Sequence, residues 1–438
     1  MIGAACQASR AVTASAGEGP SRSIGATRRS PSAVQLTEEH NVPEGSGSLR
    51  LAFVTPRYGA GVVGGAETAV REAAAGLAAR GYSVEVLTTC ARDHYTWANE
   101  FAPGVERDGA VTLRRFETVA VRDLAPWAHL QGRLMRDDTL DEAEDRTWVN
   151  GRFRVPELYL YLAESARTYD AIVFAPYLFW STLYCAAIAP DRTIMMPCLH
   201  DESYARLPSV RAALAGSAAT WFLSEPEHQL GHHLASLPAE HPVVGCAVDI
   251  PATYDADGFR ERHDLERPFV LYAGRREEGK GWQQVLRGFG AAVLRHRLPI
   301  DLVTFGVGDP QVPLGLEGRV VDLGYLEDAE VPDAFAAASA YLQPSANESF
   351  SRTIMEAWLA GTVVIANGAS DVVTWHCERS GGGLLYRDEL ELGVCLRFVA
   401  EAPKLAAELA GLGREYVLAN YRWPQVLDAM EASLERLS

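Results

Sequence analysis

The sequence predicts an α/β protein with two Rossmann-like, doubly wound domains, each built on a parallel sheet. In both halves of the chain, short apolar strands alternate with amphipathic helices, which is the pattern of consecutive βαβ units. The length of 438 residues suits two domains of ordinary size. A hydrophobic content of 48% and a charged content of 22% are typical of a soluble globular protein with a normal core.

The N-terminal half begins with a strand, a glycine-rich loop and a helix. Residues 50–55 (RLAFVT) predict a buried strand, and the glycine-rich loop follows at residues 58–65. Apolar residues at helical spacing predict a helix over residues 66–80, and residues 83–88 (SVEVLT) predict the next strand. This β-loop-α-β unit predicts a parallel sheet.

The C-terminal half repeats the pattern. Its predicted strands are residues 268–273, 300–305, 320–323, 340–342 and 362–366, and its predicted helices are residues 282–297, 330–339, 351–360 and 423–437. The polar segment at residues 249–266 interrupts both patterns and predicts the domain boundary. We therefore expect a disordered tail over residues 1–48, an N-terminal domain over 49–250, a C-terminal domain over 251–422 and a terminal helix over 423–438.

The charge and the cysteines limit the partners and the compartment. The formal net charge of −17 argues against a nucleic-acid partner, because nucleic-acid binders usually carry a basic surface. The seven cysteines form no Cys-x-x-Cys pair, which is typical of reduced thiols in the cytoplasm. We expect a cytoplasmic protein, and peripheral contact with the inner face of the membrane through a local basic patch stays open.

Residues 59–64 (GAGVVG) match the GxGxxG fingerprint of dinucleotide-binding proteins. Residues 56–58 separate this loop from the strand, and the next strand ends in Thr-Thr-Cys without an acid to hold a ribose. Both features argue against NAD binding. We interpret the segment as a loop whose backbone N–H groups face an anion at the start of the following helix.

Residues 274–280 (GRREEGK) nearly match a phosphate-binding P-loop. Gly281 stands where a serine or threonine would bind Mg²⁺, so the segment does not predict an ATPase. Arg275 and Lys280 remain as two cations before a helix start, which suits a diphosphate. A solvent-exposed charged loop is the alternative, but Lys280 is one of only two lysines among 40 basic residues, which favours a functional ammonium.

Residues 348–356 (ESFSRTIME) carry a third motif. Ser349 or Ser351 is expected to cap the following helix, which places Glu348 just before the helix start. A carboxylate there can accept hydrogen bonds from hydroxyls, and free N–H groups beside it suit a phosphate. On spacing alone, an acid that complements the helix dipole is the better explanation, with Glu356 facing solvent.

Taken in order, these motifs resemble a known family. GRREEGKG, the strand at residues 300–306 leading to Gly308, DLGYLED, AFAAASAYLQPS and the Glu-x7-Glu pair resemble the C-terminal half of retaining GT-B glycosyltransferases. They are most similar to the family-four group, which includes glycogen-synthase-like and mannosyltransferase-like enzymes. The GGAE at residues 64–67 matches the first loop of that group, so the resemblance covers about residues 49–438. One departure is Ser349-Phe350-Ser351, where the family usually has Gly-Phe-Gly.

The resemblance implies a GT-B fold, in which the two domains face each other across a cleft, and it implies site residues. Arg275 and Lys280 would bind the donor diphosphate, Glu348 would contact donor sugar hydroxyls, and Glu356 would hold the nucleotide ribose. The donor-binding set also includes Gly64, Gly65, Gly274, Ser349, Phe350, Ser351 and Arg352. His200, in the sequence LHDES after a predicted strand, resembles the active-site histidine of the N-terminal domain.

The implied activity is transfer of a hexosyl-type sugar with retention, from a UDP-, GDP- or ADP-sugar to an acceptor hydroxyl, in glycan or glycoconjugate biosynthesis. The acceptor would be a glycan, a glycolipid or a small molecule. No metal and no cofactor are implied, and the nucleotide sugar is a co-substrate; the Asp-x-Asp at Asp255 and Asp257 falls in the predicted linker. Two alternatives stay open: a nucleotide-sugar epimerase or hydrolase with this fold, and a non-catalytic sugar-nucleotide-binding protein.

Overall fold

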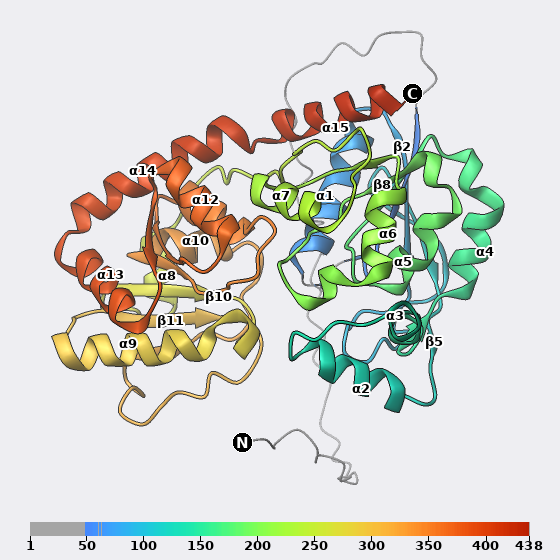
Figure 1. Cartoon of the computed structure of the whole chain (residues 1–438). Coiled ribbons are helices and arrows are strands. Elements are labelled where there is room, and N and C mark those ends of the chain that lie inside the picture. Colours follow the sequence, from blue (N-terminus) through green and yellow to red (C-terminus); the bar gives the residue numbers. More distant parts are fainter. Residues whose placement is uncertain (1–48, 60, 63, 438) are drawn as a thin grey trace, which may run out of the picture. The chain divides into compact units, whose positions relative to one another are not determined.

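The computed structural model describes residues 49–437 except residues 60 and 63 (Figure 1). The expected tail over residues 1–48 lies outside the described residues. Within the described part, the chain forms two large sheets and a small antiparallel pair of strands, β5 (Val119–Ala120) and β6 (Phe153–Arg154).

The first large sheet has seven strands in the order β3-β4-β2-β1-β7-β8-β9, and only β3 and β4 pair antiparallel. Its strands are β1 (Arg50–Val54), β2 (Ser83–Thr89), β3 (Gly104–Asp108), β4 (Val111–Phe116), β7 (Ala171–Phe174), β8 (Thr193–Met195) and β9 (Ala219–Thr220). Its helices are α1 (Gly65–Ala79), α2 (Ala125–Leu134), α3 (Glu142–Val149), α4 (Pro156–Ser165), α5 (Trp180–Cys185), α6 (Pro208–Gly216) and α7 (Glu225–Leu234), with short 3-10 turns η1 (Ala166–Thr168), η2 (Ala186–Ile188), η3 (Pro190–Arg192) and η4 (Ser203–Arg206).

The second large sheet is parallel throughout, in the order β12-β11-β10-β13-β14-β15. Its strands are β10 (Phe269–Ala273), β11 (Asp301–Phe305), β12 (Val320–Asp322), β13 (Ala340–Gln343), β14 (Val363–Asn367) and β15 (Gly383–Tyr386). The helices of this half are α8 (Ala256–Arg262), α9 (Trp282–His296), α10 (Val331–Ala337), α11 (Arg352–Leu359), α12 (Asp371–Ser380), α13 (Glu389–Glu401), α14 (Pro403–Asn420) and α15 (Trp423–Leu437), with the turn η5 (Glu278–Lys280).

Both sheets have the doubly wound order that the sequence predicts, with the first strand of each in the interior and later strands added on either side. The predicted strands and helices of the C-terminal half match the observed ones to within two residues at each end. In this order, the reversal point lies between β1 and β7 in the first sheet and between β10 and β13 in the second. Ligands of open α/β sheets bind beyond the carboxyl ends of the strands at such points.

Several observed helices were not predicted, and one of them lies in the segment that the sequence predicts to be the domain boundary. The polar segment at residues 249–266 contains α8, whose buried face has a single large side chain, Phe259. One apolar residue gives no periodicity from which a helix could be predicted. Asp255 of the Asp-x-Asp sequence caps this helix by accepting a hydrogen bond from the Gly258 N–H at 3.0 Å, and it pairs with Arg262 at 2.9 Å.

Alternate residues of the central strand β1 enter different hydrophobic clusters. Leu51 and Phe53 of β1 belong to one cluster, whereas Ala52 and Val54 belong to another. Since side chains alternate across a strand, both faces of the sheet are covered. The first of these clusters also includes Leu271 of β10, so it extends to the second sheet.

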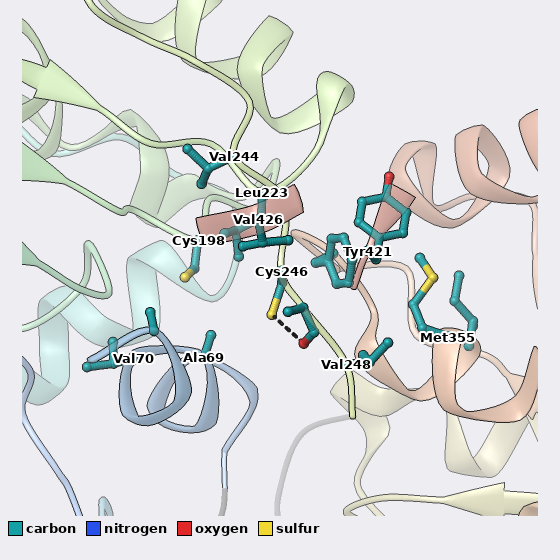
Figure 2. Packing of buried hydrophobic residues seen from close by; sticks show 14 of the residues in the cluster. Ala69, Val70, Cys198, Leu223, Val244, Cys246, Val248, Met355, Tyr421 and Val426 are labelled. Atoms are coloured by element: carbon teal, nitrogen blue, oxygen red, sulfur yellow. Dashed lines mark hydrogen bonds between the residues drawn. The ribbon is translucent and has the colours of Figure 1, made fainter. Parts of the chain in front are cut away.

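The segment around Cys246 and Val248 lies in this shared cluster. Figure 2 shows it between Val70 of α1 and Met355 of α11, with Tyr421 beside it. The last helix, α15, packs against α1 of the first sheet, and the Trp221 indole N–H donates to the Ser433 hydroxyl at 2.8 Å. The chain therefore returns to the first sheet at its C-terminal end.

The six cysteines in the described part are all unpaired and buried. None of the described helices is long and apolar enough to cross a membrane.

Candidate functional site

Glycines let the loop after β10 approach two neighbouring loops closely. A Cβ on Gly306 would lie 2.2 Å from the Gly274 carbonyl oxygen, so no side chain fits there. Gly281 has φ 74°, and a Cβ on it would lie 2.8 Å from the Pro344 carbonyl oxygen. These approaches place Lys280, at the end of η5, next to the loop that follows β13.

Lys280 and Glu348 form an ion pair at this position. The Lys280 Nζ donates to the Glu348 Oε1 at 3.0 Å and to the Ser345 Oγ at 3.5 Å. The Lys280 side chain is 32% exposed and the Glu348 side chain 16% exposed. Because an ammonium has three N–H groups and two of them are engaged, Lys280 has one N–H left to donate to a ligand that enters from solvent.

Glu348 is held as an anion. Burial raises its pKa, but the positive charges of Lys280 and His200 and the hydrogen bonds from Lys280 and Ser345 outweigh burial, so the pKa lies below its usual value. A carboxylate that stays charged at neutral pH is a strong acceptor for sugar hydroxyls. His200 comes from the first sheet, and its charge acts on Glu348 across the space between the two sheets.

His200 lies in the loop after β8. Its Nδ1 is 3.6 Å from the Glu202 Oε1, which also accepts a hydrogen bond from the Tyr177 hydroxyl at 2.6 Å. Burial raises the pKa of Glu202, but hydrogen bonds from His200 and Tyr177 and the charges of His200 and Lys280 outweigh it, and the pKa is lowered. The structure thus brings His200, Lys280 and Glu348 together and adds Glu202 to them.

The two arginines of the GRREEGKG segment differ. Arg276 is buried; its Nε donates to the Gly308 carbonyl at 2.9 Å and its terminal nitrogen pairs with Asp322 at 3.0 Å, so it holds the fold. The Arg275 side chain is 40% exposed and pairs with Glu277 at 2.9 Å. Its guanidinium also lies 3.4 Å from the His94 Nε2. Of the two, Arg275 is the one a phosphate could reach.

The loop from Glu348 to Arg352 is anchored by its aromatic residue. Phe350 is 3% exposed and packs edge-on against His376 and Tyr421, with ring centroids 5.2 Å and 4.9 Å away. The Ser224 hydroxyl donates to the Ser349 carbonyl at 2.8 Å. These contacts fix the turn that carries Glu348.

The predicted serine cap is wrong. α11 begins at Arg352, and no side-chain hydrogen bond caps it. Ser351 has φ 66°, and its Oγ accepts a hydrogen bond from the Gln343 Nε2 at 2.5 Å instead. The left-handed region favours glycine, so the backbone here suits the Gly-Phe-Gly of the resembled family better than it suits serine.

Arg352 and Glu356 lie on the first turns of α11. The Arg352 guanidinium binds the Glu72 carboxylate at 2.5 Å and 3.1 Å and the Ala247 carbonyl at 2.7 Å, so both of its terminal nitrogens are engaged within the protein. The Glu356 Oε1 lies 3.9 Å from Arg352, and the Glu356 side chain is 33% exposed. Burial and the charges of nearby acids, Asp249 first, raise the pKa of Glu356, while Arg352 lowers it.

The comparisons with known proteins agree with the fold. The family described as glycosyl transferases group 1 matches residues 267–392, from just before β10 into α13. This segment is a group 1 glycosyltransferase domain. The predicted family resemblance is therefore confirmed for the half that carries Arg275, Lys280, Glu348 and Glu356.

The curated relative mannosylfructose-phosphate synthase of Agrobacterium fabrum is 26% identical over 219 residues, which cover 42% of this chain. The aligned part spans 47% of that relative, so the match extends over about half its length.

Solved structures cover more of the chain. Sucrose-phosphate synthase of Thermosynechococcus elongatus has a TM-score of 0.67 at 18% identity, over 89% of this chain and 99% of that one. HepE of Anabaena, solved in complex with UDP and glucose, has a TM-score of 0.65 at 16% identity, over 89% and 100% of the two chains. With two parallel α/β sheets matched in this way, the fold is GT-B, as predicted.

Outside the group 1 domain, Gly64 and Gly65 start α1. A Cβ on Gly64 would lie 2.1 Å from the Glu67 carboxylate, which forms a buried ion pair with Arg57, so Gly64 makes room for Glu67. A Cβ on Gly65 would have no atom within 4 Å. Packing among the described residues therefore does not require glycine at position 65. We expect the donor to approach the backbone there.

Glu227 of α7 supports the backbone beside His200, and sequence analysis missed it. It is 1% exposed and accepts hydrogen bonds from the N–H groups of Leu199 and Leu223, both at 2.6 Å. Burial raises its pKa to about 8, although these backbone hydrogen bonds lower it. Ser224-x-x-Glu227 is a capping-box sequence and predicts a local role, whereas the contact with Leu199 depends on the tertiary fold.

Proposed function

We propose that the chain is a retaining glycosyltransferase that moves a hexose from a nucleotide-sugar donor to an acceptor hydroxyl. The observation that carries this proposal is the cluster of Lys280, Glu348 and His200, in which an ammonium pairs with a carboxylate whose pKa is also lowered by the charge of a histidine from the other sheet. The cluster stands beyond the carboxyl ends of β8, β10 and β13, where ligands of open α/β sheets bind.

Each member of the cluster has a chemical role in this proposal. Departure of the nucleoside diphosphate builds negative charge on the leaving oxygen, and Lys280 and Arg275 stabilise that charge. The uncapped start of α11 offers backbone N–H groups to the same phosphates. Glu348 holds donor sugar hydroxyls, and Glu356 holds the ribose.

Retention follows from the resemblance to retaining enzymes, in which the donor phosphate deprotonates the acceptor on the same face of the sugar. No protein nucleophile, metal or cofactor is then required. His200, held by Glu202, lies on the side of the first sheet and recognises sugar hydroxyls by hydrogen bonds.

The similar proteins suggest the first donor to try. HepE was solved with UDP and glucose, and the curated relative is named mannosylfructose-phosphate synthase. We propose UDP-glucose as the donor, with GDP- and ADP-sugars as the other choices, and residues 251–422 as the donor-binding domain. Residues 49–250 would bind the acceptor, which is a glycan, a glycolipid or a small molecule such as a sugar phosphate.

Product analysis tests the reaction. The purified chain is incubated with UDP-glucose, GDP-mannose or ADP-glucose in EDTA, with and without sugar-phosphate acceptors, and products are followed by NMR. We expect nucleoside diphosphate release and a new glycoside that keeps the anomeric configuration of the donor, with slow hydrolysis by water where the acceptor is absent. An epimerised nucleotide sugar, an inverted product, or donors that stay intact throughout would contradict the proposal.

A further inference from the structure

Three histidines converge on α7, away from Lys280 and Glu348. His228 and His232 are four residues apart on this helix and therefore lie on one face of it. His241 reaches the same place from the segment that follows the helix. Among the described residues, these three form the one group of histidine, cysteine or acidic side chains spaced to hold a metal ion.

The distances match those of a shared ion. The His228 Nε2 lies 3.2 Å from the His241 Nδ1, and the ligand atoms of all three side chains lie within 4.8 Å of one another. Two nitrogens bound to one tetrahedral zinc at about 2.1 Å each are themselves about 3.4 Å apart. The pair from His228 and His241 already has this separation, and the exposed His232 needs only a small movement to join it.

The backbone fixes the positions of these residues. The neighbours of His241 are bonded to the first sheet: the Thr220 N–H donates to the Glu240 carbonyl and the Phe222 N–H to the Pro242 carbonyl, each at 3.0 Å. On the helix side, a Cβ on Gly231 would lie 2.5 Å from the Phe222 ring, so α7 packs tightly against that ring. These contacts therefore hold α7 and the segment around His241 at a fixed separation.

A carboxylate lies near the second ring nitrogen of His228. The His228 Nδ1 is buried, makes no hydrogen bond within the described chain and lies 3.6 Å from the Glu225 Oε1. A histidine that binds a metal through one nitrogen usually donates the other N–H to a carboxylate or carbonyl. Glu225 stands where that acceptor is needed.

We propose that His228, His232 and His241 bind one divalent transition-metal ion of the zinc class, with water as the fourth ligand. Imidazole suits zinc, and three protein ligands plus one open position is a common zinc arrangement. The ion fastens α7 to the segment around His241. Glu227 of α7 accepts a hydrogen bond from the Leu199 backbone, and Ser224, just before α7, donates one to the Ser349 backbone. The ion therefore stabilises the helix that supports the donor site, and it does not itself contact the donor.

A simple hydrogen-bonded pair of imidazoles is the competing explanation for the distance between His228 and His241. It gives no role to His232, whose ring lies edge-on to both, with centroids 4.6 Å and 4.9 Å away.

Metal titration tests the site. The full chain without a polyhistidine tag is stripped with EDTA, dialysed, and titrated with ZnCl₂ by calorimetry and with CoCl₂ by visible absorption. The variants are His232→Asn, His241→Gln and, as a matched control, His233→Asn. His233 is the next residue on the same helix, is exposed, and bonds only the Gln229 carbonyl, at 2.7 Å.

We expect one ion per chain in the wild type, a tetrahedral cobalt spectrum and a higher unfolding midpoint with ZnCl₂. His232→Asn and His241→Gln should each weaken binding by more than the about 10–100-fold that loss of an outer partner costs. His233→Asn should bind as the wild type does. The proposal is overturned if the wild type takes up no stoichiometric zinc, or if His232→Asn and His233→Asn bind it equally well.

Discussion

Replacing Lys280 by methionine should lower the rate of sugar transfer at saturating donor by about 10²–10³-fold, the usual cost of losing one group that stabilises developing charge. Methionine keeps most of the volume of the lysine stem but cannot stabilise the leaving diphosphate. It also removes the cation that lies 3.0 Å from Glu348, so the acid that holds the donor sugar loses its partner. Steady-state kinetics that follow nucleoside diphosphate release measure the effect.

Lys404 provides the matched control, because it is the other lysine of the chain and lies exposed in the first turn of α14. Lys404→Met should leave the rate within about twofold of wild type, as expected for a surface substitution away from the site. If Lys280→Met transfers sugar as fast as Lys404→Met, Lys280 does not bind the diphosphate and the proposed site is wrong.

Replacing Arg352 by methionine should destabilise the fold by about 3–5 kcal/mol, the cost of breaking a buried ion pair by removing one partner. Arg352 is 14% exposed and joins α11 to Glu72 of α1 and to the Ala247 carbonyl. Without it, Glu72 stays as an unpaired acid. Burial already raises the pKa of Glu72 to about 7, although Arg352 lowers it. Thermal and denaturant unfolding measure the loss.

Two further variants separate the ion pair from a general effect of losing an arginine. Arg397→Met removes a guanidinium that is 48% exposed and pairs with Glu401 within α13, and it should cost at most about 1 kcal/mol. Adding Glu72→Gln to Arg352→Met should recover part of the stability, because it removes the buried acid that has lost its partner. Equal stability of Arg352→Met and Arg397→Met would show that the contact between α1 and α11 contributes little.

The fold could be predicted because its signals are local. Apolar runs and helical spacing give strands and helices within short windows, and their alternation gives the doubly wound sheets. α8 was missed because a helix with one buried side chain has no periodic signal. The cap at Ser351 was mispredicted because its positive φ, which turns the hydroxyl to Gln343, depends on how the loop packs around Phe350.

The site could be predicted only in part. Lys280 and Glu348 could be identified because each stands in a loop that follows a predicted strand, and the resemblance supplied their roles. Their contact could not be predicted, because it joins residues 68 positions apart and appears only in the fold. Glu202 stands in the LHDES sequence and Glu227 in a capping-box sequence, but neither pattern predicts a contact with another part of the chain. Their importance comes from what they touch, His200 and the Leu199 backbone, which sequence spacing does not reveal.

The most direct test of the central claim is the shift of the unfolding midpoint by UDP, GDP and ADP in excess EDTA. We predict that one nucleotide stabilises the wild type, by about 2.7 kcal/mol at a concentration of 100 times its Kd, and thereby identifies the base. Glu356→Ala should lose this shift, whereas Glu415→Ala, an exposed acid on α14, should keep it. If no nucleotide shifts the midpoint, if the shift disappears in EDTA, or if Glu356→Ala responds like the wild type, the metal-independent donor site described here is contradicted.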